Sequence, residues 1–112
     1  MLAWLSAFAF TQLIEVPIYA YALQELKFSN VKRITVAFGA SAISHPFVWF
    51  AFPVLIPESY VVMIIASETF AVLVEAAYLR AFGLRLYFSW SLVANALSFG
   101  LAILLRKLIG WP

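Results

Sequence analysis

The chain alternates long apolar runs with short polar links. The runs cover about 2–23, 34–52, 60–82 and 84–105, and each approaches the roughly 20 residues that a helix needs to cross a bilayer. Charged residues in "QELKFSNVKR" separate the first two runs, and its Ser29-Asn30 pair suits the start of the next helix. The prolines of "PVLIPES" mark the next link. Strands of a membrane barrel are about ten residues long and alternate in polarity, unlike these runs. We therefore expect an all-α chain, an integral membrane antiparallel four-helix bundle, with a single transmembrane domain over 1–112.

The composition agrees with a membrane protein. Hydrophobic residues make up 66% of the 112 residues and charged residues 11%, whereas a soluble domain has roughly 25% charged residues. Four spans leave no room for a separate catalytic domain, so we expect no enzymatic activity. The absence of cysteine excludes disulfides, thiolate metal sites and thiol redox relays. Because the lysines and arginines lie beside apolar runs, we interpret them as topology signals and expect no nucleic-acid partner.

The basic residues are unevenly distributed over the links. Five lie in or beside the first and third links, and two follow the last run: Lys27, Lys32, Arg33, Arg80 and Arg85, against Arg106 and Lys107. The positive-inside rule then places those two links in the cytoplasm and both termini outside it. Trp4, Trp49 and Trp111 would lie at the outer interface and Trp90 at the inner one. We expect the protein in a bacterial inner membrane.

Several ionisable residues lie inside the apolar runs. A carboxylate without a partner is costly in hydrocarbon, so such groups are paired, protonated or turned toward a cavity. With a helical rise of roughly 1.5 Å per residue, His45 and Glu68 fall at a shallower level of the membrane. Glu15, Glu75 and Asn95 fall at a deeper level. Glu68 and Glu75 are two turns apart on one helix face, which predicts that this face is buried.

The shallower pair, His45 and Glu68, is a candidate proton-binding or metal-binding site. Imidazole and carboxylate together can relay a proton or ligate a divalent metal ion such as Zn²⁺, Mn²⁺ or Fe²⁺. The alternative is a hydrogen-bonded pair that fixes the second helix to the third. Apart from such a metal ion, we expect no cofactor.

The deeper cluster, Glu15, Glu75 and Asn95, is a candidate site for a proton or a cation. Two carboxylates at one level do not readily both ionise where the dielectric constant is low. One of them should therefore hold a proton, or a cation should lie between them. A purely structural carboxyl pair is the alternative. Three intramembrane glutamates in so short a chain favour a function, because Ser, Asn or Gln would satisfy helix packing.

Two prolines lie inside the first and second runs. Pro17 and Pro46 each lack the N–H that would bond the carbonyl four residues back, so both are predicted to kink their helices. The carbonyls of Leu13 and Ala42 would be freed, one turn from Glu15 and His45. Freed carbonyls are candidate oxygen ligands for a cation or water. The alternative is that both prolines only bend the helices. The small residues of "FGASAIS" are interpreted first as a close-packing signal between helices, and the alternative is that its serines line a narrow passage.

Two stretches resemble known kinds of membrane protein. "EVPIY" in the first run and "SLVANALSFG" in the last are similar to segments of uncharacterised small bacterial membrane proteins, a resemblance that implies the four-helix fold and brings no activity. Chain length and the position of Glu15 also resemble small multidrug-resistance exporters, which carry one membrane-embedded glutamate in the first span. The chain departs from those exporters in its tryptophan and tyrosine pattern and in having His45, Glu68 and Glu75.

These features lead to one expected function and two alternatives. We expect the buried carboxylates and His45 to bind and pass a small cation, either a proton or a divalent metal ion. A bundle of four spans barely encloses a pathway, so the expected partners are the lipid bilayer and either further copies of the chain or a larger membrane complex. The main alternative is a non-transporting subunit whose glutamates meet basic residues of its neighbours. An intramembrane enzyme, which would need a bound metal or cofactor, is the third.

Overall fold

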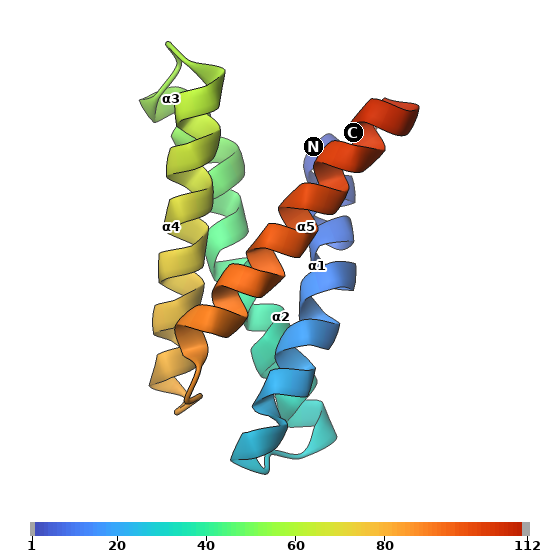
Figure 1. The fold of residues 1–112 in the computed structure, drawn as a ribbon, viewed down its shortest axis with the longest axis vertical. Helices are drawn as coiled ribbons and strands as arrows, with labels where there is room; N and C mark the ends of the chain where they lie inside the picture. The colour runs from blue at the N-terminus through green and yellow to red at the C-terminus, as the bar shows by residue number, and fades with distance from the viewer. Residues whose placement is uncertain (1, 111–112) are drawn as a thin grey trace.

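Four long helices make up the chain and run alternately in opposite directions (Figure 1). The computed structural model describes residues 2–110, and side chains are described from Trp4 onward. Within these residues the chain is all-helical, with 88% helix and no strand. The long helices are α1 (Leu2–Ala22), α2 (Asn30–Pro46), α4 (Tyr60–Ala81) and α5 (Tyr87–Ile109). A short 3₁₀ turn (Leu23–Leu26) follows α1, and a π-helical turn (Phe47–Ala51) followed by α3 (Phe52–Leu55) extends α2.

Serine caps fix the starts of two helices. Ser29 precedes α2, and its hydroxyl oxygen accepts a hydrogen bond from the backbone N–H of Lys32 at 3.2 Å. This cap makes α2 begin at Asn30, as the Ser29-Asn30 pair suggested and before the apolar run that starts at about residue 34. Ser59 caps α4 in the same way, so that α4 begins at Tyr60, where its run was expected to begin.

Glycines mark the ends of the two helices in the second half of the chain. Gly83 has a φ of 95°, which lets the chain turn sharply after α4 and delays the start of α5 to Tyr87, later than expected. Gly110 ends α5 with a left-handed φ of 71°. The last helix therefore continues to Ile109, beyond the apolar run, and includes the basic pair in its final turn.

The two intrahelical prolines have different surroundings. Pro17 lies within one continuous α-helix. At Pro46 the regular helix ends and the π-helical turn begins, which is consistent with the missing N–H of proline. Helical structure nevertheless continues from Asn30 to Leu55, over 26 residues. The irregularity expected of Pro46 thus lies in the turn after it.

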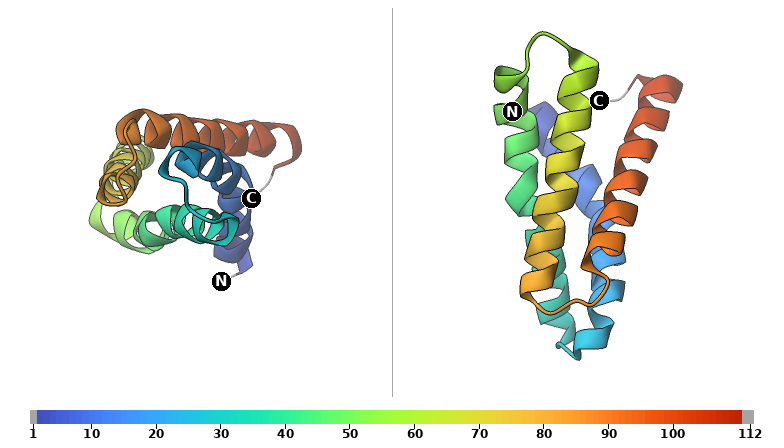
Figure 2. Two further views of the ribbon diagram at one scale, coloured as in Figure 1. Left: turned by 90° about the horizontal axis from the view of Figure 1, so that it is seen from below. Right: turned by 60° about the vertical axis from the view of Figure 1, so that its left-hand side comes forward.

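The long helices form a ring in which each packs against two neighbours. The contacting pairs are α1 with α2, α2 with α4, α4 with α5, and α5 with α1. Figure 2 (left) shows this ring along the bundle. The two connections 23–29 and 82–86 lie at one end, here named the link end. The start of α1, the connection 56–59 and the end of α5 lie at the opposite end, here named the terminal end (Figure 1).

Charges and tryptophans differ between the two ends. The helix bounds put the five basic residues of the first and third connections at the link end, and Arg106 and Lys107 at the terminal end. Trp90 lies near the link end, and Trp4 and Trp49 near the terminal end. Trp111 lies outside the described residues. The predicted orientation, with the link end in the cytoplasm, depends on this distribution of basic residues and tryptophans.

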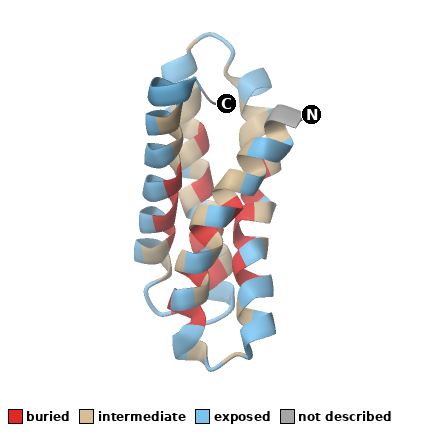
Figure 3. Cartoon of the chain, turned by 90° about the vertical axis from the view of Figure 1, so that its right-hand side faces the viewer, coloured by how far each residue is buried: buried red, intermediate tan, exposed pale blue. Residues whose placement is uncertain are grey.

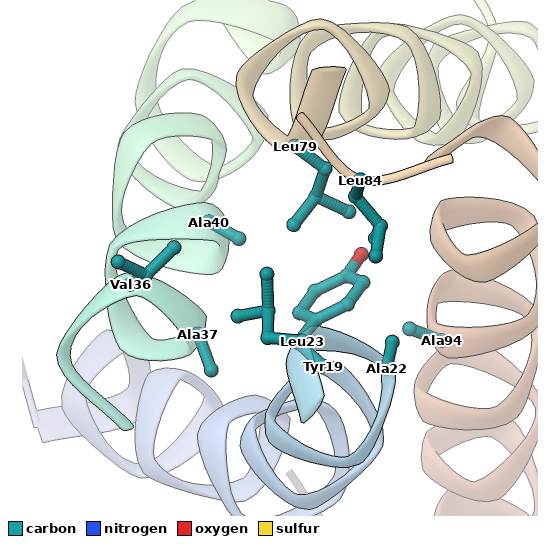
Figure 4. Packing of buried hydrophobic residues seen from close by; sticks show 9 residues of the cluster. All are labelled: Tyr19, Ala22, Leu23, Val36, Ala37, Ala40, Leu79, Leu84 and Ala94. Carbon is teal, nitrogen blue, oxygen red and sulfur yellow. The ribbon is translucent and has the colours of Figure 1, made fainter. Parts of the chain in front are cut away.

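A packed apolar cluster fills the ring toward the link end. Tyr19, Leu23 and Leu79 are completely buried in it, and Figure 4 shows the Tyr19 ring in the middle of its neighbours. The cluster consists of Tyr19, Ala22, Leu23, Val36, Ala37, Ala40, Leu79, Leu84 and Ala94. In Figure 3 the buried residues likewise gather along the inner faces of the helices.

The bundle exposes apolar side chains on its outer surface and buries polar side chains beside its apolar cluster. Large apolar side chains are exposed on all four long helices, the reverse of a helix bundle in water. Three helical segments are long and apolar enough to cross a membrane, namely Asn30–Leu55, Tyr60–Ala81 and Tyr87–Ile109. Over its described residues α1 does not meet the same criteria of length and hydropathy, and it contains Gln12 and Glu15. Both of these polar side chains are buried in the ring, at 8% and 1% exposure.

Candidate functional site

A cavity of about 320 Å³ lies inside the ring. Among its lining residues, Tyr60 and Arg106 are exposed and lie at the terminal end, and this part is here named the mouth; Glu75 and Asn95 are buried and line its inner part. α5 leans away from α4 toward the terminal end (Figures 1 and 2), and residues of both helices line the cavity. All five site residues proposed from the sequence line this cavity, together with several serines: Glu15, His45, Glu68, Glu75, Asn95, Ser41, Ser44, Ser67 and Ser98.

Glu15 is held by hydroxyl groups from two neighbouring helices. It lies on α1 and is 1% exposed. The Ser41 hydroxyl of α2 donates to Oε1 at 2.5 Å, and the Ser98 hydroxyl of α5 donates to Oε2 at 2.5 Å. Both carboxyl oxygens of Glu15 therefore have a neutral donor.

Glu75 on α4 is held from the other three long helices. The Tyr19 hydroxyl of α1 donates to its Oε1 at 2.6 Å, and the Asn95 amide of α5 donates to the same oxygen at 3.1 Å. The Ser44 hydroxyl of α2 donates to Oε2 at 2.6 Å. Like Glu15, Glu75 is 1% exposed. The two carboxyl groups thus connect all four long helices.

The groups that hold these two carboxyls do not neutralise them. Four hydroxyls and one amide donate to them, and all five donors are uncharged. Glu15 and Glu75 also line the same cavity, so a charge on one would disfavour a charge on the other. Neutral donors favour a carboxylate but leave its charge uncompensated, which is costly in a low-dielectric interior. The arrangement favours the uptake of a proton or a cation.

Asn95 belongs to a polar stripe along α5. Its amide also donates to the backbone carbonyl of Ser91 at 2.8 Å. The Ser91 hydroxyl in turn donates to the backbone carbonyl of Val72 on α4 at 2.7 Å. Together with Ser98 these residues form a polar stripe at i, i+4 and i+7 of α5. The stripe holds α5 against both carboxyl-bearing helices.

The sequence interpretation missed several direct partners of the carboxyl groups. Ser41 and Ser44 were assigned first to helix packing, yet each donates to a glutamate. Their i, i+3 spacing on one helix face was the available signal. Tyr19 lies one turn after Glu15, on the same face of α1. Nothing in its sequence context indicated a bond to Glu75.

No direct hydrogen bond joins His45 and Glu68 within the described residues, although both line the cavity. His45 is 8% exposed and packs among aromatic rings, with centroid distances of 5.2 Å to Phe8, 6.1 Å to Trp4 and 6.2 Å to Trp49. Its Nδ1 is buried without a hydrogen-bond partner in the described part of the chain. Glu68 is partly buried. The expected direct pair is therefore not formed.

The described residues contain no group of three or more His, Cys, Asp or Glu side chains arranged to hold a metal ion. A divalent metal ion at His45 and Glu68 stays a prediction, and it would need further ligands. The carbonyl groups of Leu13 and Ala42 were expected as oxygen ligands beside the prolines. Neither residue is among those that line the cavity in the described chain. The Leu13 side chain is 74% exposed on the outer face of α1.

No protein-family model, curated protein or solved structure matches the chain. Function is therefore inferred from the chemistry of the cavity. The site combines an opening at the terminal end, two carboxyl groups deep inside, and a packed apolar cluster beyond them.

Proposed function

We propose that the chain is an integral membrane protein in which Glu15 and Glu75 bind a proton or a small cation that enters through the cavity. One observation carries the proposal: the cavity reaches two buried carboxyl groups whose donors are all uncharged. Binding of a positive charge would compensate the carboxylate charge that these neutral donors do not neutralise. The apolar exterior and the three membrane-length helical segments support the membrane placement.

Passage of the ion to the other side requires the apolar cluster at the link end to open. Tyr19 is a member of that cluster and also donates to Glu75. Neutralisation of Glu75 weakens this bond, since a hydrogen bond to a charged acceptor is stronger than one to a neutral acceptor. In this proposal the charge of Glu75 thereby controls how firmly Tyr19 holds the cluster closed.

The closed link end also suggests that the chain works together with other membrane-protein chains. A single bundle holds a cavity open at one end, so we propose that the chain works as a homo-oligomer or within a larger membrane complex. The same observation favours a second candidate function, a non-transporting subunit whose cavity accepts a side chain or ligand from a neighbour. The mass of the intact particle in mild detergent separates these cases, because a fixed ratio to a different polypeptide indicates the subunit.

Proton flux through purified protein in liposomes tests the proposal. A pH-sensitive dye inside the vesicles reports flux while potassium and valinomycin set the membrane potential. We expect parent protein to dissipate the gradient and Glu75→Gln to reduce the rate at least about tenfold, because the amide keeps the shape but has no charge to compensate. Glu58→Gln is the matched control, since Glu58 is exposed in the connection before α4.

Two results would count against the proposal. Parent-like flux in Glu75→Gln would refute the assignment of the site. If the parent protein moved neither protons nor metal ions under any gradient, the transport function would fall and the subunit function would replace it.

A further inference from the structure

The cavity is larger than a proton or a metal ion requires. Its volume of about 320 Å³ lies within the range of roughly 300–1,000 Å³ that is common for cavities binding small organic molecules. Such sites are mostly apolar, with a few polar groups that fix the ligand. Its lining has this character, with apolar and aromatic side chains around a few carboxyl, hydroxyl and imidazole groups.

Aromatic rings from different parts of the chain line the cavity. Phe10 comes from α1, Trp49 from the π-helical turn, Tyr60 from α4 and Phe99 from α5. Aromatic faces bury apolar groups and also attract cations through their quadrupole. The walls therefore suit a molecule that has an apolar body and a positive centre.

The charged groups of the cavity also favour a positive centre. Three carboxyl groups line it, those of Glu15, Glu68 and Glu75, and one basic residue, Arg106. Arg106 lies at the mouth, where its guanidinium donates to the Tyr60 hydroxyl at 3.1 Å. Negative groups thus predominate inside the cavity, and the one arginine is engaged at its edge.

The hydrogen-bonding groups that the protein leaves open indicate what kind of cation fits. Glu15 and Glu75 already receive the five donors described above. Glu68 receives no hydrogen bond from the described residues, and the buried Nδ1 of His45 also has no partner there. Glu68 is thus an open acceptor in the wall of the cavity, whereas Nδ1 of His45 is buried among aromatic rings and is not offered to a ligand. A ligand with N–H donors satisfies the Glu68 carboxyl group, whereas a quaternary ammonium does not.

We propose that the cavity binds a small organic ammonium ion that has N–H groups and an apolar body. Its nitrogen lies at Glu68, and its body lies among the aromatic walls. This inference rests on the cavity of the proposed function and names a ligand class beyond the proton or small inorganic cation. It depends on Glu68, whereas the flux proposal depends on Glu75, so each can fail without the other.

Equilibrium binding of three matched probes tests the inference, with Trp49 in the cavity wall as a fluorescent reporter. The probes are 2-phenylethylammonium, its N,N,N-trimethyl derivative and neutral 2-phenylethanol, measured on whole protein in detergent against protein-free micelles. We expect the primary ammonium to bind at least about tenfold more tightly than either other probe, because it alone combines charge with N–H donors. Glu68→Gln should weaken its binding at least about tenfold, and Glu58→Gln should not.

The outcomes are distinguishable. Equal binding of the trimethyl derivative would overturn the requirement for N–H donors, equal binding of 2-phenylethanol would overturn the requirement for charge, and no binding of any probe would overturn the site. Glu68→Asp keeps the charge on a shorter side chain and should recover part of the affinity, which separates the loss of charge from a loss of folding. Failure of all probes together with Glu75-dependent proton flux would remove this inference and leave the proposed function intact.

Discussion

Tyr19 has two roles at the scale of single residues. Its ring packs in the apolar cluster, and its hydroxyl, 2.6 Å from Oε1 of Glu75, donates to the polar site above that cluster. Asn95 and Ser44 also donate to Glu75, so loss of the tyrosine hydroxyl leaves the carboxyl partly held. The ring and the hydroxyl can therefore be separated by substitution.

Removal of the Tyr19 hydroxyl should destabilise the bundle without disrupting its packing. For Tyr19→Phe we expect a loss of about 1–2 kcal/mol in the free energy of unfolding, the upper range for a buried hydrogen bond in a membrane protein. Reversible unfolding in mixed micelles measures this loss. Tyr21→Phe is the matched control, because Tyr21 is 65% exposed and should change little. Equal stability of both variants would contradict the role of the Tyr19–Glu75 bond.

At the scale of helices, α2 and α4 meet at a close contact between Gly39 and Tyr78. The Tyr78 hydroxyl donates to the backbone carbonyl of Val36 at 2.9 Å and lies directly over Gly39. A Cβ atom at this glycine would overlap the hydroxyl oxygen. The contact allows α2 to approach α4 closely enough for Ser44 to reach Glu75.

A methyl group at this contact should therefore weaken the bundle. We expect Gly39→Ala to cost about 1–3 kcal/mol, as overpacking of a tight contact does. Gly100→Ala is the control, since a Cβ there meets nothing within 4 Å. Adding Tyr78→Phe to Gly39→Ala removes the overlapping oxygen and should recover part of the loss. Unfolding of all three variants in the same micelles provides the measurement, and a neutral Gly39→Ala would show that Tyr78 moves aside freely.

The helices show how far the sequence alone could predict the structure. Apolar runs located the four long helices, but the start of α2 depends on the Ser29 cap, which lies outside the run. The rise per residue gives the depth of a side chain in its helix, and it placed Glu15, Glu75 and Asn95 at one level. Depth does not give the direction of a side chain around the helix axis.

That direction decides which polar groups meet. His45 and Glu68 lie at similar depth, yet His45 packs among rings of α1 and of its own helix. Ser41 and Ser44 looked like packing residues, because only the order of helices in the ring brings them to the carboxyl groups. Such long-range packing leaves no local pattern in the sequence.

At the scale of the whole molecule, the two ends of the bundle carry different charge. Five basic residues lie at the link end, and Arg106 and Lys107 at the terminal end. If the chain is oriented as the positive-inside rule predicts, the link end faces the cytoplasm and the mouth of the cavity faces outward. A ligand or cation would then reach Glu68 from outside the cell.

Single cysteines can test this orientation, because the natural chain has none. Glu58 lies at the terminal end and Gln24 at the link end, and both are exposed. In intact cells we expect an impermeant thiol reagent to label Glu58→Cys, and to label Gln24→Cys only after the membrane is permeabilised. The reverse pattern would place the cavity mouth in the cytoplasm.

The buried position of Glu15 has a consequence for how the chain is made. α1 leaves the ribosome first, but its carboxyl group obtains its first donor from Ser41, 26 residues later, and its second from Ser98, 83 residues later. Until α5 has been synthesised, one carboxyl oxygen of Glu15 has no hydroxyl donor. Over its described residues α1 also does not meet the criteria of length and hydropathy for a membrane span, whereas the other three long helical segments do. We therefore expect α1 to remain beside the insertion machinery and to enter the bilayer together with its partner helices. The first helix to be synthesised would then be among the last to reach its final position in the membrane.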